Sequence, residues 1–463
     1  MNNYAPGTMF WSRRHMLQKM CNAALGLVTT GSMLATCGGR SPSSNTTSVK
    51  ISDAPKVDPG SASYQSWLEV VTRFEKAHPQ YNIVGDSYQF DPTTFYPMFA
   101  AGQADDAINT YFTESQYMIE HHIAADIQAD FDTTPFKDIF SPDVRQVVSG
   151  SNGHMYGLPA NAYVLGLIYN RALFTKAGLD PNQPPTNWDD FRAYAKRIAE
   201  KTGVSGFVEN AAGNQGGWHF INWLYSTGGV VESNAGTKTT AAFQSAQGVA
   251  VLRMLQQMRF TDKSMQMQTA TFQQGDITNA VATGKAGMCI GAGDSWGTLY
   301  SGKGSLDFLG LGPMPQNNGQ HGALGGGGLW VINSKSTANA IRGAVLYTSY
   351  RSFDLHSYED QLKAQVAQNK PVGIPGANLF RGSYARQYDA ITRKYANLPL
   401  QNYAAYAHSS VPLVPEPRLH AQDLYSELDA VMQAIFTDPS ADPEALLENT
   451  ASSFQSRYLT TAS

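Results

Sequence analysis

The sequence has little cysteine, little charge and no long apolar run. Its 463 residues include three cysteines, Cys21, Cys37 and Cys289, and so few cysteines exclude a scaffold that depends on disulfides. Charged residues make up 15% of the chain, and 33 Lys and Arg against 37 Asp and Glu leave a net charge of −4. The lack of a basic excess argues against nucleic acid as a partner.

The chain does have enough apolar material to fold around a core. Hydrophobic residues account for 42% of the sequence and aromatic residues for 11%, a composition that excludes bulk disorder. The length is typical of two or three globular domains. The 42 glycines, 23 tyrosines and 7 tryptophans supply neutral hydrogen-bonding and aromatic groups at positions where charge would be usual.

The first forty residues have the pattern of an export signal. Arg13 and Arg14 precede an apolar run over residues 21–33, which is shorter than the roughly 20 residues of a membrane-spanning helix. Residues 12–18 resemble a twin-arginine export motif, and ordinary export is the alternative. We therefore expect residues 1–36 to be a signal peptide.

Cys37 ends a second motif in this region. Residues 34–37 resemble a bacterial lipobox, in which the cysteine is acylated and becomes the first residue of the mature protein. The alternative is a plain cleavage site with an incidental cysteine. We expect a lipid anchor at Cys37 that holds the exported protein on the extracellular or periplasmic side of the cell membrane.

Residues 37–60 are rich in Ser, Thr, Pro, Asn and Gly, which is typical of a flexible tether.

Helical and extended patterns alternate along the rest of the chain, which predicts an α/β fold. Residues 107–112, 163–169 and 286–290 are short and apolar enough to be strands. Asn187 has the position of a helix cap, and the helix after it is expected to end near Gly203.

Several segments, taken in order, resemble one family. They lie at residues 152–159, 167–174, 177–179, 184–190, 284–288, 312–315 and 325–332. Together they resemble the extracellular solute-binding proteins of ABC importers, specifically the sugar-binding family that includes maltose-binding protein. The resemblance implies a periplasmic-binding-protein-like fold, with two α/β lobes joined by a multi-crossing hinge and a central ligand cleft between them.

The resemblance also implies a function and a division into lobes. Residues 61–155 with 325–370 are expected to form one lobe, and residues 156–324 with 371–463 the other. The implied function is that of a monomeric receptor, which closes over a neutral carbohydrate without chemistry or cofactor. It would deliver that solute to the membrane-embedded permease subunits of an ABC importer.

A neutral sugar presents flat C–H faces and rims of hydroxyl groups, so its site needs aromatic platforms and planar polar groups. Aromatic residues occur where strands and loops are expected to meet. Tyr111 ends one strand, Tyr163 begins another, Trp218 follows the loop over residues 210–217, and Trp296 follows the strand over residues 286–290. In open α/β sheets such positions line the crevice. The alternative for each is packing in the core, which we favour for Trp223. By family resemblance, Trp218 and Trp296 correspond to ligand-stacking aromatic residues.

Four other residues are weaker candidates for the site. Glu114 would accept hydrogen bonds from sugar hydroxyls or simply begin the following helix, and Asp294 would contact the solute or cap a turn. By resemblance, Gly326 and Gly327 belong to the segment where the family's backbone approaches the ligand closely. The alternative for these glycines is a bare crossing between the lobes.

Residues 293–297 form a G-x-S-x-G motif, so an exported serine hydrolase with Ser295 as its nucleophile is the alternative function. A nucleophile elbow needs a helix directly after the serine. Gly297, Gly302 and Gly304 predict that this helix is missing. We therefore predict a binding protein that is not an enzyme and that uses no metal site.

Overall fold

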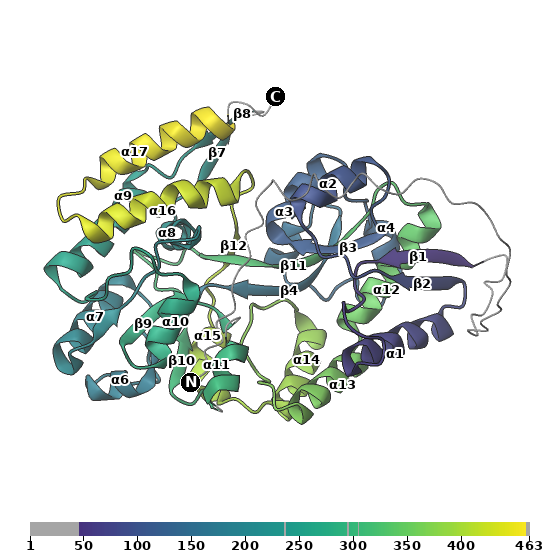
Figure 1. Ribbon diagram of the computed structural model, residues 1–463, viewed down its shortest axis with the longest axis horizontal. Helices are drawn as coiled ribbons and strands as arrows, with labels where there is room; N and C mark the ends of the chain where they lie inside the picture. The colour runs from purple at the N-terminus through teal and green to yellow at the C-terminus, as the bar shows by residue number, and fades with distance from the viewer. Residues whose placement is uncertain (1–45, 236–237, 294–295, 304, 460–463) are drawn as a thin grey trace, which may run out of the picture. The chain divides into compact units, whose positions relative to one another are not determined.

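The structure is a computed structural model that describes residues 46–235, 238–293, 296–303 and 305–459 (Figure 1). The candidates Arg13, Arg14 and Cys37 lie outside these residues. The described residues all belong to one compact unit. Within this part of the chain, no helix combines the length and the apolar character needed to cross a membrane.

The first large sheet has six strands. They are β1 (Thr47–Ile51), β2 (Tyr81–Gly85), β3 (Ala107–Tyr111), β4 (Gly157–Val164), β11 (Ala323–Ile332) and β12 (Leu413–Pro415). β1 lies between β3 and β2 and is parallel to both. β11 pairs antiparallel with β3 and with β4, and its first residues pair parallel with β12. The carboxyl ends of β1, β2 and β3 therefore meet at one edge of the sheet.

Eight helices among the described residues accompany this sheet. They are α1 (Ala62–Ala77), α2 (Pro92–Ala100), α3 (Phe112–Glu120), α4 (Gln128–Phe131), α5 (Pro142–Val147), α12 (Ala338–Phe353), α13 (Leu355–Ala367) and α14 (Gly382–Tyr395). α3 begins directly after β3, so the strand end and the helix start share one corner (Figure 1).

The prediction of a flexible tether through residue 60 is wrong from residue 47 onward. β1 occupies residues 47–51 in the interior of the first sheet, and Val49 and Ile51 are fully buried. The strand alternates inward and outward side chains over five residues. Ser and Thr before it and Pro after it give this stretch the composition of a loop, which hid the strand.

The second large sheet has four strands, in the order β10 (Leu309–Gly312), β5 (Gly166–Asn170), β9 (Ala286–Gly291) and β6 (Ser205–Phe207). A separate hairpin pairs β7 (Glu232–Ala235) with β8 (Lys238–Ala241). The helices of this half are α6 (Arg171–Lys176), α7 (Trp188–Thr202), α8 (Gln215–Tyr225), α9 (Ala246–Gln256), α10 (Gln274–Ala282), α11 (Trp296–Lys303), α15 (Ala404–Ala407), α16 (Ala421–Thr437) and α17 (Pro443–Phe454).

Local signals explain where several of these elements begin and end. The side chain of Asn187 accepts a hydrogen bond from the backbone N–H of Asp190 and caps α7, and Gly203 ends that helix with a φ of 75°. Both ends agree with the prediction.

The expected strand over residues 163–169 is divided, because the chain leaves the first sheet after Val164 and enters the second at Gly166.

The crossing between the sheets is held by Tyr406. Its hydroxyl donates to the carbonyl oxygen of Val164 at 2.6 Å and accepts from the N–H of Val164 at 3.3 Å. A Cβ at Gly166 would lie 2.5 Å from the carbonyl oxygen of Gly312, so the second sheet begins at a position with no room for a side chain.

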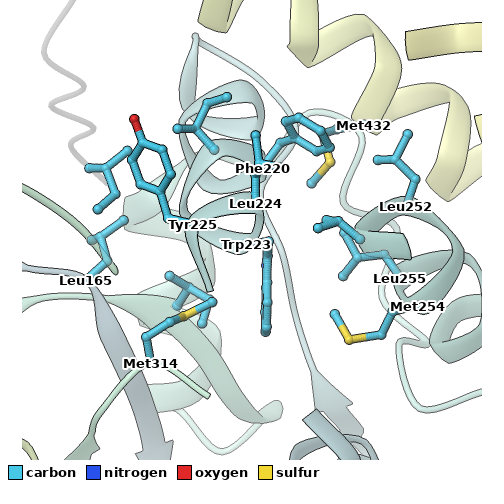
Figure 2. Packing of buried hydrophobic residues seen from close by; sticks show 14 of the residues in the cluster. Leu165, Phe220, Trp223, Leu224, Tyr225, Leu252, Met254, Leu255, Met314 and Met432 are labelled. Atoms are coloured by element: carbon cyan, nitrogen blue, oxygen red, sulfur yellow. The ribbon is translucent and has the colours of Figure 1, made fainter. Parts of the chain in front are cut away.

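Three groups of buried side chains surround the two sheets. One contains apolar residues of β1, β2, β3, α1 and α12, and a second is built around α8, with Trp223 fully buried among Phe220, Leu252 and Met314 (Figure 2). The third packs residues of β5, β9 and β10 against α10 and α11. The prediction that Trp223 packs in the core is confirmed. The architecture is the expected one of two α/β lobes joined by crossing strands. The exact lobe boundaries given above stay a prediction.

The prediction that no helix follows the G-x-S-x-G motif is wrong. Residues Trp296–Lys303 form α11, although Gly297 and Gly302 each lower helix propensity by about 1 kcal/mol. Trp296 and Tyr300 are four residues apart and both buried in the same apolar cluster. Tertiary packing of this helix face therefore outweighs the local preference of the glycines.

Candidate functional site

A cavity of about 500 Å³ lies where the carboxyl ends of β1, β2 and β3 meet. We call it the edge cavity. Its lining includes Asp53, Lys56, Tyr88, Phe90, Tyr111 and Arg351. Tyr111 is 58% exposed at the end of β3, and its ring meets Phe90 edge to face at 6.2 Å. The strand end thus presents an aromatic ring that the fold leaves uncovered.

Asp53 anchors the wall of the edge cavity. It accepts hydrogen bonds from Nε1 of Trp67 at 2.8 Å and from the hydroxyl of Tyr347 at 2.7 Å, and it pairs with Arg351 at 2.9 Å. Burial raises the pKa of Asp53, although Arg351 and the two donors act in the opposite direction. The carboxylate is committed to these three partners, so it fixes the cavity wall and is not a free ligand group.

A second group of side chains gathers where β4 and β11 run side by side. We call it the aromatic–carboxylate cluster, and its members are Glu114, Tyr163, Trp218, Glu416 and Tyr425. The rings of Tyr163 on β4 and Trp218 on α8 meet edge to face at 6.4 Å. The hydroxyl of Tyr425 donates to Glu416 at 3.4 Å, and Trp218 lies beside the same carboxyl. Segments that are as far apart in the sequence as residues 114 and 425 thus contribute side chains to this cluster.

Glu114 lies in the first turn of α3, where the positive end of the helix dipole favours a carboxylate. The hydroxyl of Tyr96 donates to Oε2 of Glu114 at 2.5 Å. Burial and the charge of Glu114 raise the pKa of Tyr96, so this hydroxyl keeps its proton. The other oxygen, Oε1, accepts a long hydrogen bond from the hydroxyl of Thr113 at 3.5 Å.

Glu416 is the functional candidate that the sequence did not reveal. Burial raises its pKa to about 7, and the negative charge of Glu114 contributes in the same direction. Pro415 and Pro417 flank it and fix the backbone on both sides. This rigid placement of a single carboxylate is the signal that could have identified it.

A second cavity of about 500 Å³ has Glu416 in its lining. We call it the crossing cavity, and its lining includes Tyr225, Val230, Glu232, His321, Glu416 and Arg418. Arg418 pairs with Glu120 at the end of α3, at 2.5 Å. The Arg418–Glu120 ion pair thus joins one lining residue of this cavity to the end of α3.

The structure does not give Trp296 the exposed face that a sugar platform needs. Its side chain is 0% exposed, and its ring packs 4.8 Å from that of Tyr403. Of the four aromatic candidates, Tyr111, Tyr163 and Trp218 lie at the cavity or the cluster, whereas Trp296 lies in the core. Asp294 lies outside the described residues.

The two glycines have a different role from the expected one. A Cβ at Gly326 would lie 2.5 Å from the hydroxyl of Tyr163. A Cβ at Gly327 would lie 2.2 Å from the backbone oxygen of Asn161 on β4. Their missing side chains thus make room for the protein's own residues at the crossing.

Where the chain is described, no three His, Cys, Asp or Glu side chains come together as metal ligands.

Two α/β lobes, crossing strands and a polar, aromatic site at the strand ends define a two-lobed solute-binding protein. A family model supports this directly. The chain belongs to the family of bacterial extracellular solute-binding proteins, whose model matches residues 58–344.

Curated relatives carry names of binding proteins. The sn-glycerol-3-phosphate-binding periplasmic protein UgpB of Yersinia pestis is 26% identical over 311 residues, which cover 61% of this chain and 65% of that protein. UgpB of Escherichia coli is 25% identical over 290 residues, which cover 57% of this chain and 62% of the relative. The chain therefore spans less than two thirds of the length of these relatives.

Solved structures share the fold at low sequence identity. A solute-binding protein of Thermotoga lettingae bound with α-D-tagatose has a TM-score of 0.62 at 18% identity, over 89% of this chain and 99% of that one. UgpB of Mycobacterium tuberculosis in complex with glycerophosphocholine has a TM-score of 0.61 at 16% identity, over 89% and 98%. The family to which the chain belongs is one of solute-binding proteins and not of enzymes, so the hydrolase alternative is rejected; its Ser295 lies outside the described residues.

Ionisation of Glu416 should make the protein less stable as the pH rises from about 5 to 7. Its pKa is about 7 in the folded protein against an ordinary 4.5. Between these values the folded state holds more protons than the unfolded chain, so the free energy of unfolding falls with rising pH, by on the order of 1–3 kcal/mol. Urea unfolding of the wild type and of Glu416→Gln, from about pH 4 to pH 8, measures this. Equal pH slopes in the two proteins would contradict it.

Proposed function

We propose that the protein is a lipid-anchored receptor that delivers a neutral carbohydrate to the permease subunits of an ABC importer. The observation that carries this proposal is the aromatic–carboxylate cluster, together with the ring of Tyr111 at the edge cavity. Tyr111 presents an uncovered ring, Tyr163 and Trp218 form a pair of rings, and Glu114 supplies a carboxylate oxygen. Family membership gives the general class of function, and the cluster supports the class of solute.

The chemistry of the cluster suits hydroxyl-rich solutes. Aromatic faces bind the C–H faces of a pyranose ring, and carboxylates accept hydrogen bonds from neighbouring hydroxyl groups. A phosphate group would instead be repelled by the carboxylates of Glu114 and Glu416, and the charge of Glu114 already contributes to the raised pKa of Glu416. These two carboxylates favour an uncharged solute.

A glycerol phosphate is the second candidate, because the edge cavity also contains Lys56 and Arg351. These two cations could hold a phosphate group, and the curated relatives are named for binding sn-glycerol 3-phosphate. Arg351, however, is already paired with Asp53 at 2.9 Å, which leaves Lys56 as the other cation of the described cavity lining. The neutral solute is therefore preferred.

A thermal-shift screen separates the two candidates. A neutral sugar at about 100 times its Kd should stabilise the protein by about 2.7 kcal/mol. sn-Glycerol 3-phosphate and glycerophosphocholine, tested in the same way, should give no shift. A shift with these phosphates and with no carbohydrate would overturn the proposal of a neutral solute.

Trp218→Ala should weaken binding of that sugar about ten- to hundredfold, or about 1–3 kcal/mol, because a stacked indole contributes chiefly in the bound state. Trp218→Phe keeps an aromatic face and should retain most of the affinity. Calorimetric titration of the folded variants measures both. An unchanged Kd for the alanine variant would remove Trp218 from the site.

The proposed lipid anchor is tested at Cys37. Cys37→Ser removes the expected acylation site, so the protein should move from the membrane fraction to the soluble fraction outside the cytoplasm. Cys289→Ser is the matched control, because that cysteine is buried and free. A Cys37→Ser protein that stays in the membrane fraction would show that another segment holds it there.

A further inference from the structure

We propose that a third cavity is a second ligand site, which takes a compact, uncharged ring molecule with one hydroxyl group and through which that molecule changes the affinity for the solute. Val164 and Leu165 line this cavity at the point where the chain passes from the first sheet to the second, and we call it the junction cavity. The binding step is independent of the identity of the solute. Only the effect on solute affinity rests on the proposed function.

The junction cavity has the size of a single ring. Its volume is about 240 Å³. An engineered apolar cavity of about 150 Å³ in another protein binds benzene, whereas sites that enclose a whole drug-sized ligand begin at roughly 300 Å³. The space therefore suits one ring with a small substituent.

The walls of the cavity are apolar, and one polar atom in them is unpaired. Val144, Leu165 and Met314 line it and are at most 1% exposed (Figure 2). Ser141 lines it too, and its Oγ is buried without a hydrogen-bond partner in the described part of the chain. Burying a hydroxyl in this way costs free energy that a bonded partner recovers. A ligand hydroxyl at Oγ of Ser141 supplies that partner.

The charges around the cavity exclude an anion. Asp143 is exposed on its lining, and none of the residues that line it in the described part of the chain is Lys, Arg or His. A carboxylate or phosphate on the ligand would therefore meet a like charge and no compensating cation. The apolar walls also disfavour a cation, because a charge loses its hydration there. An uncharged ligand remains.

The junction cavity lies behind strands that contribute to the candidate solute site. On β12, Leu413 lines the junction cavity and the next residue, Val414, lines the crossing cavity. On β4, Val164 lines the junction cavity, whereas Tyr163 belongs to the aromatic–carboxylate cluster. Successive residues of a strand point to opposite faces of the sheet. Gly325 of β11 pairs with Val164, and a Cβ there would lie 2.3 Å from Cγ of Leu413.

This arrangement gives the second ligand a route to the first. The junction cavity shares no lining residue with the edge cavity or the crossing cavity, so the two ligands do not compete for space. A molecule in it contacts the strands that hold Tyr163 and Val414 from behind. Any shift of these strands on solute binding changes the fit of that molecule, and by linkage each ligand then alters the affinity for the other by the same factor.

The binding step is tested with phenol and toluene, which have equal size and differ in the hydroxyl group, by calorimetric titration of the full chain. Phenol should bind about two- to tenfold more tightly than toluene, the contribution of one hydrogen bond. Ser141→Ala should remove this difference. The side chain of Ser141 makes no capping bond to α5, so the variant should keep the stability of the wild type.

A second variant fills the cavity. Asn378 is exposed on its lining, so Asn378→Trp can occupy the space without disturbing the core, and Asn378→Ala is the matched control. Asn378→Trp should weaken phenol about tenfold or more, and Asn378→Ala should leave its affinity within about twofold.

The effect on the solute is measured with a carbohydrate that stabilises the protein, titrated with and without saturating phenol. Its Kd should change by about fivefold or more, the lower end of typical coupling between two sites. Asn378→Trp, which fills the cavity permanently, should shift the Kd in the same direction without phenol.

The outcomes separate this inference from the proposed function. The site is overturned if neither ring binds, or if Asn378→Trp leaves the affinity for phenol unchanged. Equal affinities for phenol and toluene overturn the role of Ser141 and with it the hydroxyl in the proposed ligand. A solute Kd that phenol does not alter overturns the coupling and leaves the receptor intact. Failure of every carbohydrate to bind overturns the proposed function, while the phenol and toluene titrations still decide the site.

Discussion

Replacing Trp296 by alanine should lower the free energy of unfolding by about 3–5 kcal/mol, because it opens a cavity in a closely packed cluster. The side chain is fully buried and packs against Tyr403, with Tyr300 and Leu306 in the same cluster. Since the ring has no exposed face, the intrinsic affinity of the folded variant for its solute should stay within about twofold of the wild type. Chemical unfolding of the ligand-free variant measures the stability, and titration of the folded protein measures the affinity.

Trp296→Phe is the control for this experiment. It keeps most of the buried ring, so it should lose clearly less stability than the alanine variant. The structural assignment would be contradicted by an alanine variant that unfolds at the wild-type urea concentration but binds its solute much more weakly. That result would return Trp296 to the binding site.

Replacing Glu209 by alanine should also cost about 3–5 kcal/mol of stability, because it leaves buried polar groups without their partner. Glu209 and His219 are both 0% exposed, and Nδ1 of His219 lies 2.5 Å from Oε1 of Glu209. Nε1 of Trp223 donates to the second oxygen at 2.8 Å. One carboxylate thus satisfies two side chains of α8, the helix that carries Trp218.

Two variants make this prediction specific. Glu209→Gln keeps a hydrogen-bond acceptor of the same size and should lose less stability than Glu209→Ala. The double variant Glu209→Ala/His219→Leu removes the orphaned imidazole and should recover part of the loss. A single alanine variant that loses less than about 1 kcal/mol would show that water or a neighbouring group replaces the carboxylate.

The sequence predicted best where a local pattern and the fold agree. Asn187 and Gly203 are residue types that commonly cap helices, and the two ends of α7 were predicted correctly from them. Tyr111 follows a short apolar strand, and strand ends line the crevice of such sheets, so its exposure at a cavity followed from its position. These are features that a few neighbouring residues determine.

The errors arose where distant segments decide the outcome. Trp296 has the glycine-rich surroundings of a loop, but its burial depends on Tyr403, more than one hundred residues away in the chain. β1 looks like a tether, and its place in the sheet depends on pairing with β2 and β3. Glu416 joins the cluster because β12 pairs with the start of β11. Such contacts leave no periodic signal in the sequence.

The crossing of the chain between the two sheets has a consequence for its synthesis. The first sheet is complete when β11 and β12 have been made, and the second lobe needs α16, which packs on α8 and ends at Thr437. Until then β3 has an open edge and the apolar face of α8 is uncovered. We therefore expect a nascent chain to gain its stable fold in one late step, near the end of translation.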